Sequence, residues 1–307
     1  MPALHELELT NNGQPLDSAP GSMGLLRDST DATADRDELW RRWRNDGYLF
    51  LPGLLDREQV RGAREVMLAR LAEVASFEFV NLGYHVTGNN PALERVLRQG
   101  PMVAFYELFL GGPVRCFDYT WFRHKKAQSA VSTQPHYDGV YMSRGTPHLF
   151  TSWTPFGDVP IEMGGLMLLE SSHRNQELIA GYGQTDVDLY CETELAGRLL
   201  ERARQEGREL TADENSQILW NSSGAYSKSA IRAQADLGGR WLTADYRMGD
   251  LVVFGMHLMH ASHDNRTDEM RISTDTRYQL ASDPVDERWI GDDPPNHTIR
   301  AKRGMIC

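Results

Sequence analysis

Cysteine is scarce in this chain of 307 residues, which has three cysteines: Cys116, Cys191 and Cys307. Thiols so few and so scattered can neither build a disulfide framework nor supply the closely spaced thiolates of a structural zinc site. We therefore expect ordinary thiols in the core or at the surface.

Long apolar runs are missing as well. No stretch of about 18 apolar residues is present that could span a membrane. The N-terminus also lacks the basic segment and apolar core of a secretory signal. The sequence therefore predicts a cytoplasmic protein that has no membrane partner.

Positive charge is in deficit. The chain has 32 Lys and Arg residues against 43 Asp and Glu residues, which gives a formal net charge of -11. A nucleic-acid surface needs a basic patch, and the one basic cluster, Arg123-His124-Lys125-Lys126, is short. We expect a small-molecule substrate and no nucleic-acid partner, while the sequence leaves the oligomeric state open.

The N-terminal third contains a polar stretch and then helical patterns. Residues 1–35 have few periodic apolar positions and predict a flexible arm or lid. A helix is expected to begin at Asp35 or Asp37 and to end at Gly47, before a strand from Tyr48 to Leu51. A second helix, Arg57 to Ala75, carries an apolar stripe suited to packing against a sheet.

The rest of the chain favours short strands. Three short segments, CFDYTWF, HLFTSWTPF and GLMLLE, lie between Val114 and Arg174 among Gly and Pro residues and predict strands. Residues 175–245 are more polar and predict a partly helical insertion, after which GDLVVFGM resumes the sheet. We expect residues 36–307 to form one domain, mainly β with flanking helices, as a double-stranded β-helix (a jelly roll, cupin-like).

A candidate metal site stands out in QPHYDGVY and in the later segment GDLVVFGMHLMHASHDN. Side chains two apart in a strand share a face, so His136 and Asp138 can contact one ion, and His260 is a third ligand from elsewhere. Two imidazoles and one carboxylate form the facial triad of non-haem Fe(II) oxygenases, which leaves positions open for a cosubstrate and oxygen. His257 and His263 lie at odd offsets from His260, so in a continuous strand they would face away from the metal.

A candidate anion site follows the third ligand. Arg271 ends a strand-like run, and its planar guanidinium can bind a carboxylate through two charge-assisted hydrogen bonds. Ser273 would share its face and add a hydroxyl donor. The alternative is that Arg271 is a solvated surface charge, but its type and position together favour an anchor for a dicarboxylate.

With these residues in place, the chain resembles the phytanoyl-CoA dioxygenase family of Fe(II)/2-oxoglutarate-dependent oxygenases. The resemblance runs through DELWRRWRNDGYLFLPGLLDREQV, the HYD segment, WTPFGDVPIEMGGLMLLESSHR, the GDLVVF strand and the later Arg271 and Arg277-Tyr278. The chain departs from the family pattern at Glu162-Met163-Gly164 and at Glu170-Ser171-Ser172-His173, segments that shape the substrate pocket in such enzymes.

The resemblance implies a cofactor, cosubstrates and site residues. Fe(II) would be bound by His136, Asp138 and His260, and 2-oxoglutarate by Arg271 with help from Ser273. Thr151 and Arg123 lie in segments that face the cosubstrate in the family. Oxygen and 2-oxoglutarate would be consumed with release of succinate and CO2 while a C–H bond of a small metabolite is hydroxylated or otherwise oxidised. Related halogenases lack the carboxylate ligand, so Asp138 favours oxidation.

Two other functions remain open at this point. Two histidines and an aspartate also suit a zinc hydrolase in which the metal activates water, although Arg271 and Ser273 would then have no role. A non-catalytic metal-binding or sugar-binding jelly roll would tolerate loss of Asp138. The sequence does not identify the substrate.

Overall fold

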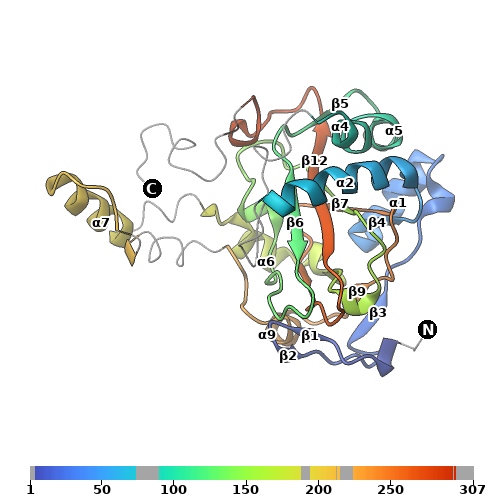
Figure 1. The fold of residues 1–307 in the computed structure, drawn as a ribbon, viewed down its shortest axis with the longest axis horizontal. Helices are drawn as coiled ribbons and strands as arrows, with labels where there is room; N and C mark the ends of the chain where they lie inside the picture. Colours follow the sequence, from blue (N-terminus) through green and yellow to red (C-terminus); the bar gives the residue numbers. More distant parts are fainter. Residues whose placement is uncertain are drawn as a thin grey trace.

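The computed structural model describes residues 4–73, 90–187, 194–211, 213, 214, 224–292 and 294. Two sheets dominate it (Figure 1). The larger has the order β4-β10-β7-β12-β5, with β6 paired to β12, and the smaller has the order β11-β8-β9-β3. The strands of the larger sheet are β4 (Tyr48–Leu51), β5 (Val114–Cys116), β6 (Trp121–Lys125), β7 (Phe150–Pro155), β10 (Leu251–Gly255) and β12 (Arg271–Leu280).

The smaller sheet contains strands that are far apart in the chain. They are β3 (Met23–Leu25), β8 (Leu166–Leu169), β9 (Trp241–Thr243) and β11 (His260–Ser262). Apolar side chains from both sheets, including Trp153 and Phe254 from the larger and Leu166 and Leu242 from the smaller, form one buried cluster. The two sheets therefore pack face to face as the predicted double-stranded β-helix.

Helices cover the outer face of the larger sheet (Figure 1). Leu39, Val60, Val96 and Phe109, one from each helix, belong to the same buried cluster as Val253 of β10. The interior of the sandwich is thereby shielded on this side. These helices are α1 (Arg36–Asp46), α2 (Arg57–Glu73), α4 (Pro91–Leu97) and α5 (Gly100–Leu110).

The first helix begins and ends where its sequence predicts. The Asp35 side chain accepts a hydrogen bond from the backbone N–H of Glu38, and Gly47 takes the left-handed conformation (φ 81°) that commonly ends a helix. The strand from Tyr48 to Leu51 follows, as expected. The second helix is confirmed from Arg57 to Glu73, and the last two residues of its predicted range lie outside the described part of the chain.

Short helices occupy much of the described part of the predicted insertion at 175–245, but β9 (Trp241–Thr243) also lies in this range, so the sheet resumes before GDLVVFGM. These helices are α6 (Gln176–Ala180), α7 (Glu194–Gln205) and α9 (Ala230–Leu237), with the 3₁₀ helix η6 at Tyr182–Gln184. Among the described residues, no helix combines the length and the apolar character needed to cross a membrane. Further 3₁₀ turns are η1 (Leu4–Glu6), η2 (Thr30–Ala32), η3 (Asp138–Val140), η4 (Ile161–Met163), η5 (Ser172–Arg174) and η8 (Glu287–Trp289).

The N-terminal segment differs from the flexible arm that we expected over 1–35. β3 pairs in parallel with β9 and completes the smaller sheet. β1 (Thr10–Asn11) and β2 (Gln14–Pro15) form a hairpin, and the buried Asn11 side chain donates to the carbonyl oxygen of Ser262 at 2.8 Å. The segment is thus part of the β-sandwich, held by partners distant in sequence that leave no local periodicity to detect.

Candidate metal centre and adjoining cavities

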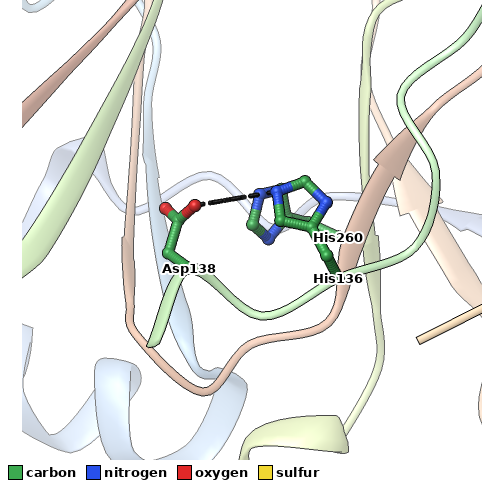
Figure 2. A group of neighbouring side chains, drawn as sticks. All are labelled: His136, Asp138 and His260. Atoms are coloured by element: carbon green, nitrogen blue, oxygen red, sulfur yellow. Dashed lines mark ion pairs between the residues drawn. The ribbon is translucent and has the colours of Figure 1, made fainter. Parts of the chain in front are cut away.

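Three buried side chains meet inside the sandwich. His136, Asp138 and His260 offer ligand atoms that all lie within 4.8 Å of one another. Figure 2 shows the Asp138 carboxylate facing both imidazoles, with Oδ1 3.7 Å from Nε2 of each histidine. One ion can therefore contact all three residues, as the facial triad requires.

The backbone brings the two histidines together from distant segments. His136 and His260 form an isolated antiparallel bridge, in which each N–H donates to the other's carbonyl oxygen at 3.1 Å. His260 begins β11, so the bridge attaches the segment that carries His136 to the edge of the smaller sheet. This register places both imidazoles beside Asp138.

The prediction that His136 and Asp138 share one face of a strand is wrong in its local structure. Asp138 begins the 3₁₀ turn η3, and only the residues before it are extended. The chain turns because Gly139 approaches the segment after β10: its N–H donates to the carbonyl oxygen of Met256 at 2.9 Å, and an added Cβ would lie 3.3 Å from the His257 ring. The turn nevertheless presents the carboxylate to both imidazoles.

The imidazoles are oriented to bind through Nε2. Nδ1 lies 2.7 Å from the carbonyl oxygen of Gln134 in His136 and 3.0 Å from that of Leu258 in His260. A carbonyl oxygen only accepts, so Nδ1 carries the proton and the Nε2 lone pair is free for a metal. Burial, followed by the nearby His136, lowers the pKa of His260 to about 3, which keeps it neutral.

Asp138 is ionised by its surroundings. Burial alone would raise its pKa, but the charge of Arg277 and the adjacent His260 and His136 outweigh burial and hold the pKa well below its usual range. The Arg277 guanidinium lies 3.0 Å from Oδ2, and the Thr151 hydroxyl donates to the same oxygen at 2.5 Å. The site thus offers a carboxylate and two imidazoles, a donor set that suits a divalent transition metal.

A pocket beside these residues contains most of the predicted cosubstrate residues. Arg271, Arg123 and Thr151 all line it, together with His136 and His260. Arg123 forms an ion pair with Asp275, and the Thr151 hydroxyl is engaged by Asp138. Ser273 lies fully buried on β12, two residues from Arg271, and its hydroxyl has no hydrogen-bond partner among the described residues.

Arg271 is buried without a carboxylate partner. Its side chain is 3% exposed, and Nη1 donates to the carbonyl oxygen of Gly164 at 2.8 Å. Within the described part of the chain Nε has no partner, and none of the ion pairs includes Arg271. Burial lowers its pKa to about 10, so it keeps its charge at neutral pH. The prediction of a solvated surface charge is thereby excluded.

A buried lysine is the cross-strand neighbour of Arg271. Lys125 pairs across the strands with Arg271, and its Nζ donates to the hydroxyls of Ser262 (3.0 Å) and Ser132 (3.2 Å). Burial, with a contribution from Arg271, holds the pKa of Lys125 well below its usual range. The basic cluster at 123–126 is therefore not a surface patch, because Lys125 and His124 are buried and the Arg123 side chain faces the interior pocket.

The histidines on either side of His260 do not line this pocket. His263 is fully buried, with Nε2 3.4 Å from the Thr243 hydroxyl. The His257 ring lies edge-on to Tyr137, with a centroid distance of 5.6 Å. Neither belongs to the group of possible metal ligands found among the described residues.

A further cavity of about 270 Å³ opens on the other side of the candidate ligands. His136, Asp138 and Arg277 form its inner end. Trp121, Tyr141 and Met142 contribute apolar surface, and Arg123 lines both this cavity and the pocket that contains Arg271. A small molecule in this cavity would therefore lie directly against the metal ligands.

Arg277 contacts the candidate ligand Asp138 but was not among the site residues predicted from the sequence. A signal was present, because Arg277 lies six positions after Arg271 on the same strand, and even offsets share a face. Arg271, Ser273, Asp275 and Arg277 thus form a row on the inward face of β12.

Known proteins resemble this chain over most of its length. A model of the phytanoyl-CoA dioxygenase family matches residues 43–273. Two relatives carry the name 1-deoxypentalenic acid 11-beta-hydroxylase. The one from Streptomyces exfoliatus is 29% identical over 48% of this chain and 58% of its own length, and the one from Streptomyces arenae is 24% identical over 83% of this chain and 85% of its own.

The arrangement of the strands has a counterpart among solved structures. The epimerase SnoN, crystallised in complex with Fe3+, alpha ketoglutarate and nogalamycin RO, superimposes with a TM-score of 0.54 at 20% identity. The superposition covers 84% of this chain and 87% of that one. At this identity the match supports the jelly-roll fold.

Proposed function

The chain belongs to the phytanoyl-CoA dioxygenase family of Fe(II)/2-oxoglutarate-dependent oxygenases, and from that premise we propose that it hydroxylates a C–H bond of a small organic metabolite. The donor set fits the metal, since two imidazoles and one carboxylate are buried together. Fe(II) bound there would supply the centre that activates oxygen.

The observation that carries the proposal is the buried Arg271. A cation removed from water is costly unless a counter-charge pairs with it, and the nearby Asp275, whose charge acts against burial to raise the pKa of Arg271, forms its ion pair with Arg123 instead. The pocket of Arg271 also contains His136 and His260. A dicarboxylate that contacts the metal at one end and Arg271 at the other would remove this cost, and its distal carboxylate can accept two hydrogen bonds from the guanidinium.

The supporting residues have distinct roles in this proposal. Arg271 orients the cosubstrate, and Ser273 supplies a hydroxyl from the same face of β12, for which its unpartnered Oγ is available. Arg123 separates the cosubstrate from the substrate, since it lines both cavities. Thr151 acts indirectly, because its hydroxyl contacts Asp138.

The cavity next to the metal ligands suggests the size and character of the substrate. Its volume of about 270 Å³ lies near the lower end of small-molecule pockets, and Trp121, Tyr141 and Met142 give it an apolar wall. A CoA thioester would require a basic surface for its phosphates, and the buried cluster at 123–126 does not provide one. We favour a compact, largely apolar metabolite as the substrate, which agrees with relatives that are named for a deoxypentalenic acid. We also favour a cytoplasmic location for the protein.

The first test is an anaerobic titration of the metal-free protein with Fe(II) and then 2-oxoglutarate. A keto acid chelated to Fe(II) gives a weak visible charge-transfer band. We expect this band, and we expect Arg271→Ala to need far more 2-oxoglutarate to produce it. Iron binding without a band would overturn the cosubstrate assignment and favour a zinc hydrolase, and failure to bind metal would favour a non-catalytic jelly roll.

A further inference from the structure

We propose that Arg277 is a positioning residue that, together with Thr151, restricts Asp138 to binding the metal through Oδ1 alone. The inference rests on the proposed function, because it concerns the same metal site. It assigns different roles to the two oxygens of one carboxylate and gives a role to Arg277, which lines both the pocket that contains Arg271 and the larger cavity.

The contacts divide the two oxygens clearly. Oδ2 receives the Thr151 hydroxyl at 2.5 Å and lies 3.0 Å from Nη2 of Arg277. Oδ1 lies 3.7 Å from Nε2 of each histidine. Two donors therefore occupy the oxygen that points away from the imidazoles, while the other oxygen is left for a metal.

The two donors come from a rigid part of the sheet. Arg277 on β12 and Thr151 on β7 are direct partners across the antiparallel pair. β7 lies between β10 and β12, so both of its edges are hydrogen-bonded. Side chains opposite each other on paired strands keep a fixed separation. The Asp138 carboxylate therefore cannot rotate without breaking hydrogen bonds that the sheet holds in place.

The Arg277 side chain is itself confined. It is 1% exposed, and its guanidinium carbon lies 4.6 Å from the centre of the Trp121 ring. A guanidinium stacked on an aromatic face is held by cation–π attraction. Among the described residues, Asp138 is the one carboxylate that pairs with it, since the neighbouring Asp275 pairs with Arg123.

The restriction matters because coordination positions are limited. Three protein ligands leave three positions on an octahedral ion, and a chelating keto acid and oxygen would occupy all of them. A carboxylate that rotated to bind through both oxygens would take one of these positions. Fixing Oδ2 on Arg277 and Thr151 keeps that position open, and the same hydrogen bonds orient Oδ1 toward the ion.

Two pairs of variants test the inference on the full-length protein. Thr151→Val removes the hydroxyl at nearly constant shape, and Thr154→Val is its matched control, because Thr154 is buried on the same strand and its hydroxyl has no partner among the described residues. Arg277→Met removes the charged donor, and Arg277→Lys keeps the charge without the planar fork. The four proteins are titrated anaerobically with Co(II), whose visible bands report coordination, and then with 2-oxoglutarate.

We expect Thr151→Val and Arg277→Met to bind Co(II) about 10- to 100-fold more weakly, the usual effect of losing a residue that orients a metal ligand. Their Co(II) bands should differ from those of the wild type, Arg277→Lys should lie between, and Thr154→Val should match the wild type. A merely structural role would lower the unfolding midpoint without changing the bands.

Wild-type affinity and bands in both Thr151→Val and Arg277→Met would overturn the inference. If Arg277→Met does not fold, Thr151→Val against Thr154→Val still decides. A wild-type protein that binds Co(II) but shows no spectral change with 2-oxoglutarate would refute the proposed function. The Co(II) affinities of the variants relative to the wild type would still test the role of Arg277.

Discussion

The two ends of the inward face of β12 carry arginines in opposite situations. Arg277 at one end lies 3.0 Å from the Asp138 carboxylate, whereas Arg271 at the other forms no ion pair among the described residues. Both side chains are almost completely buried, 1% and 3% exposed respectively. Burial therefore does not distinguish them, and the presence or absence of a counter-charge does.

This difference separates scaffold from binding site. A buried ion pair has both of its charges within the folded chain, so removing one residue leaves the other charge buried without a partner and destabilises the fold. A buried cation without an ion-pair partner has its counterpart in a ligand, and burial and the neighbouring Arg271 hold the pKa of Lys125 well below its usual range. The same substitution should therefore mainly lower stability at Arg277 and mainly weaken ligand binding at Arg271.

The largest effect is expected at Arg277. Arg277→Met should lower the free energy of unfolding of the metal-free protein by about 3–5 kcal/mol, because it leaves the buried Asp138 carboxylate without its counter-charge. Urea denaturation at neutral pH measures this change. A loss below about 1 kcal/mol would mean that the pair contributes nothing beyond a surface ion pair.

Arg271→Met should weaken 2-oxoglutarate binding by about 2–5 kcal/mol, the usual cost of removing one partner of a buried charge pair. Metal-free stability should change by only about 1 kcal/mol, because the hydrogen bond lost from Gly164 is offset by removing an unpaired buried charge. The charge-transfer titration and urea denaturation give the two values. Equal destabilisation by both arginine variants would contradict the distinction between the two ends.

Low pH should destabilise the metal-free protein through two buried histidines. The pKa of His260 and of His263 is lowered from 6.5 to about 3, chiefly by burial. Between about pH 3 and pH 6.5 the unfolded state therefore binds more protons than the folded state. The stabilising contribution of the two neutral histidines is present above about pH 6.5 and is lost as the pH falls. Lowering the pH from 6.5 to 5.5 should cost the metal-free protein roughly 2 kcal/mol.

The variant His263→Gln separates the two contributions. It should lose about half of this pH dependence, because His260 then remains as the other strongly shifted histidine. Denaturation curves at several pH values measure the slope. An unchanged slope would show that His263 is not buried in its neutral form.

The smallest effect is expected at Thr151. Thr151→Val should lower stability by about 1 kcal/mol through loss of one hydrogen bond to a charged group, while Thr154→Val should leave stability nearly unchanged. Thermal denaturation of the two variants side by side gives the difference. A larger loss in Thr154→Val would mean that packing, and not the contact with Asp138, dominates at these positions.

Residue chemistry allowed much of this site to be predicted from the sequence. His136, Asp138, His260 and Arg271 combine residue types that suit a metal and a dicarboxylate, and the structure brings them to one pocket region. Strand patterns likewise predicted the jelly roll. These features are visible because they depend on composition and local periodicity.

The features that escaped prediction depend on distant contacts. β3 is a three-residue strand whose partner lies near the opposite end of the chain, so no local pattern marked it. The turn at Asp138 arises from the approach of Gly139 to Met256. The role of Arg277 required the register of β12 against β7.

The pairing of β3 with β9 has a consequence for how the protein is made. Met23 must wait for Trp241, and His136 for His260, before these backbones can pair. Pairings between remote segments form slowly, because a long loop must close first. During synthesis on the ribosome the N-terminal strand therefore emerges long before its partner. The three candidate metal ligands can therefore come together only after His260 has been translated.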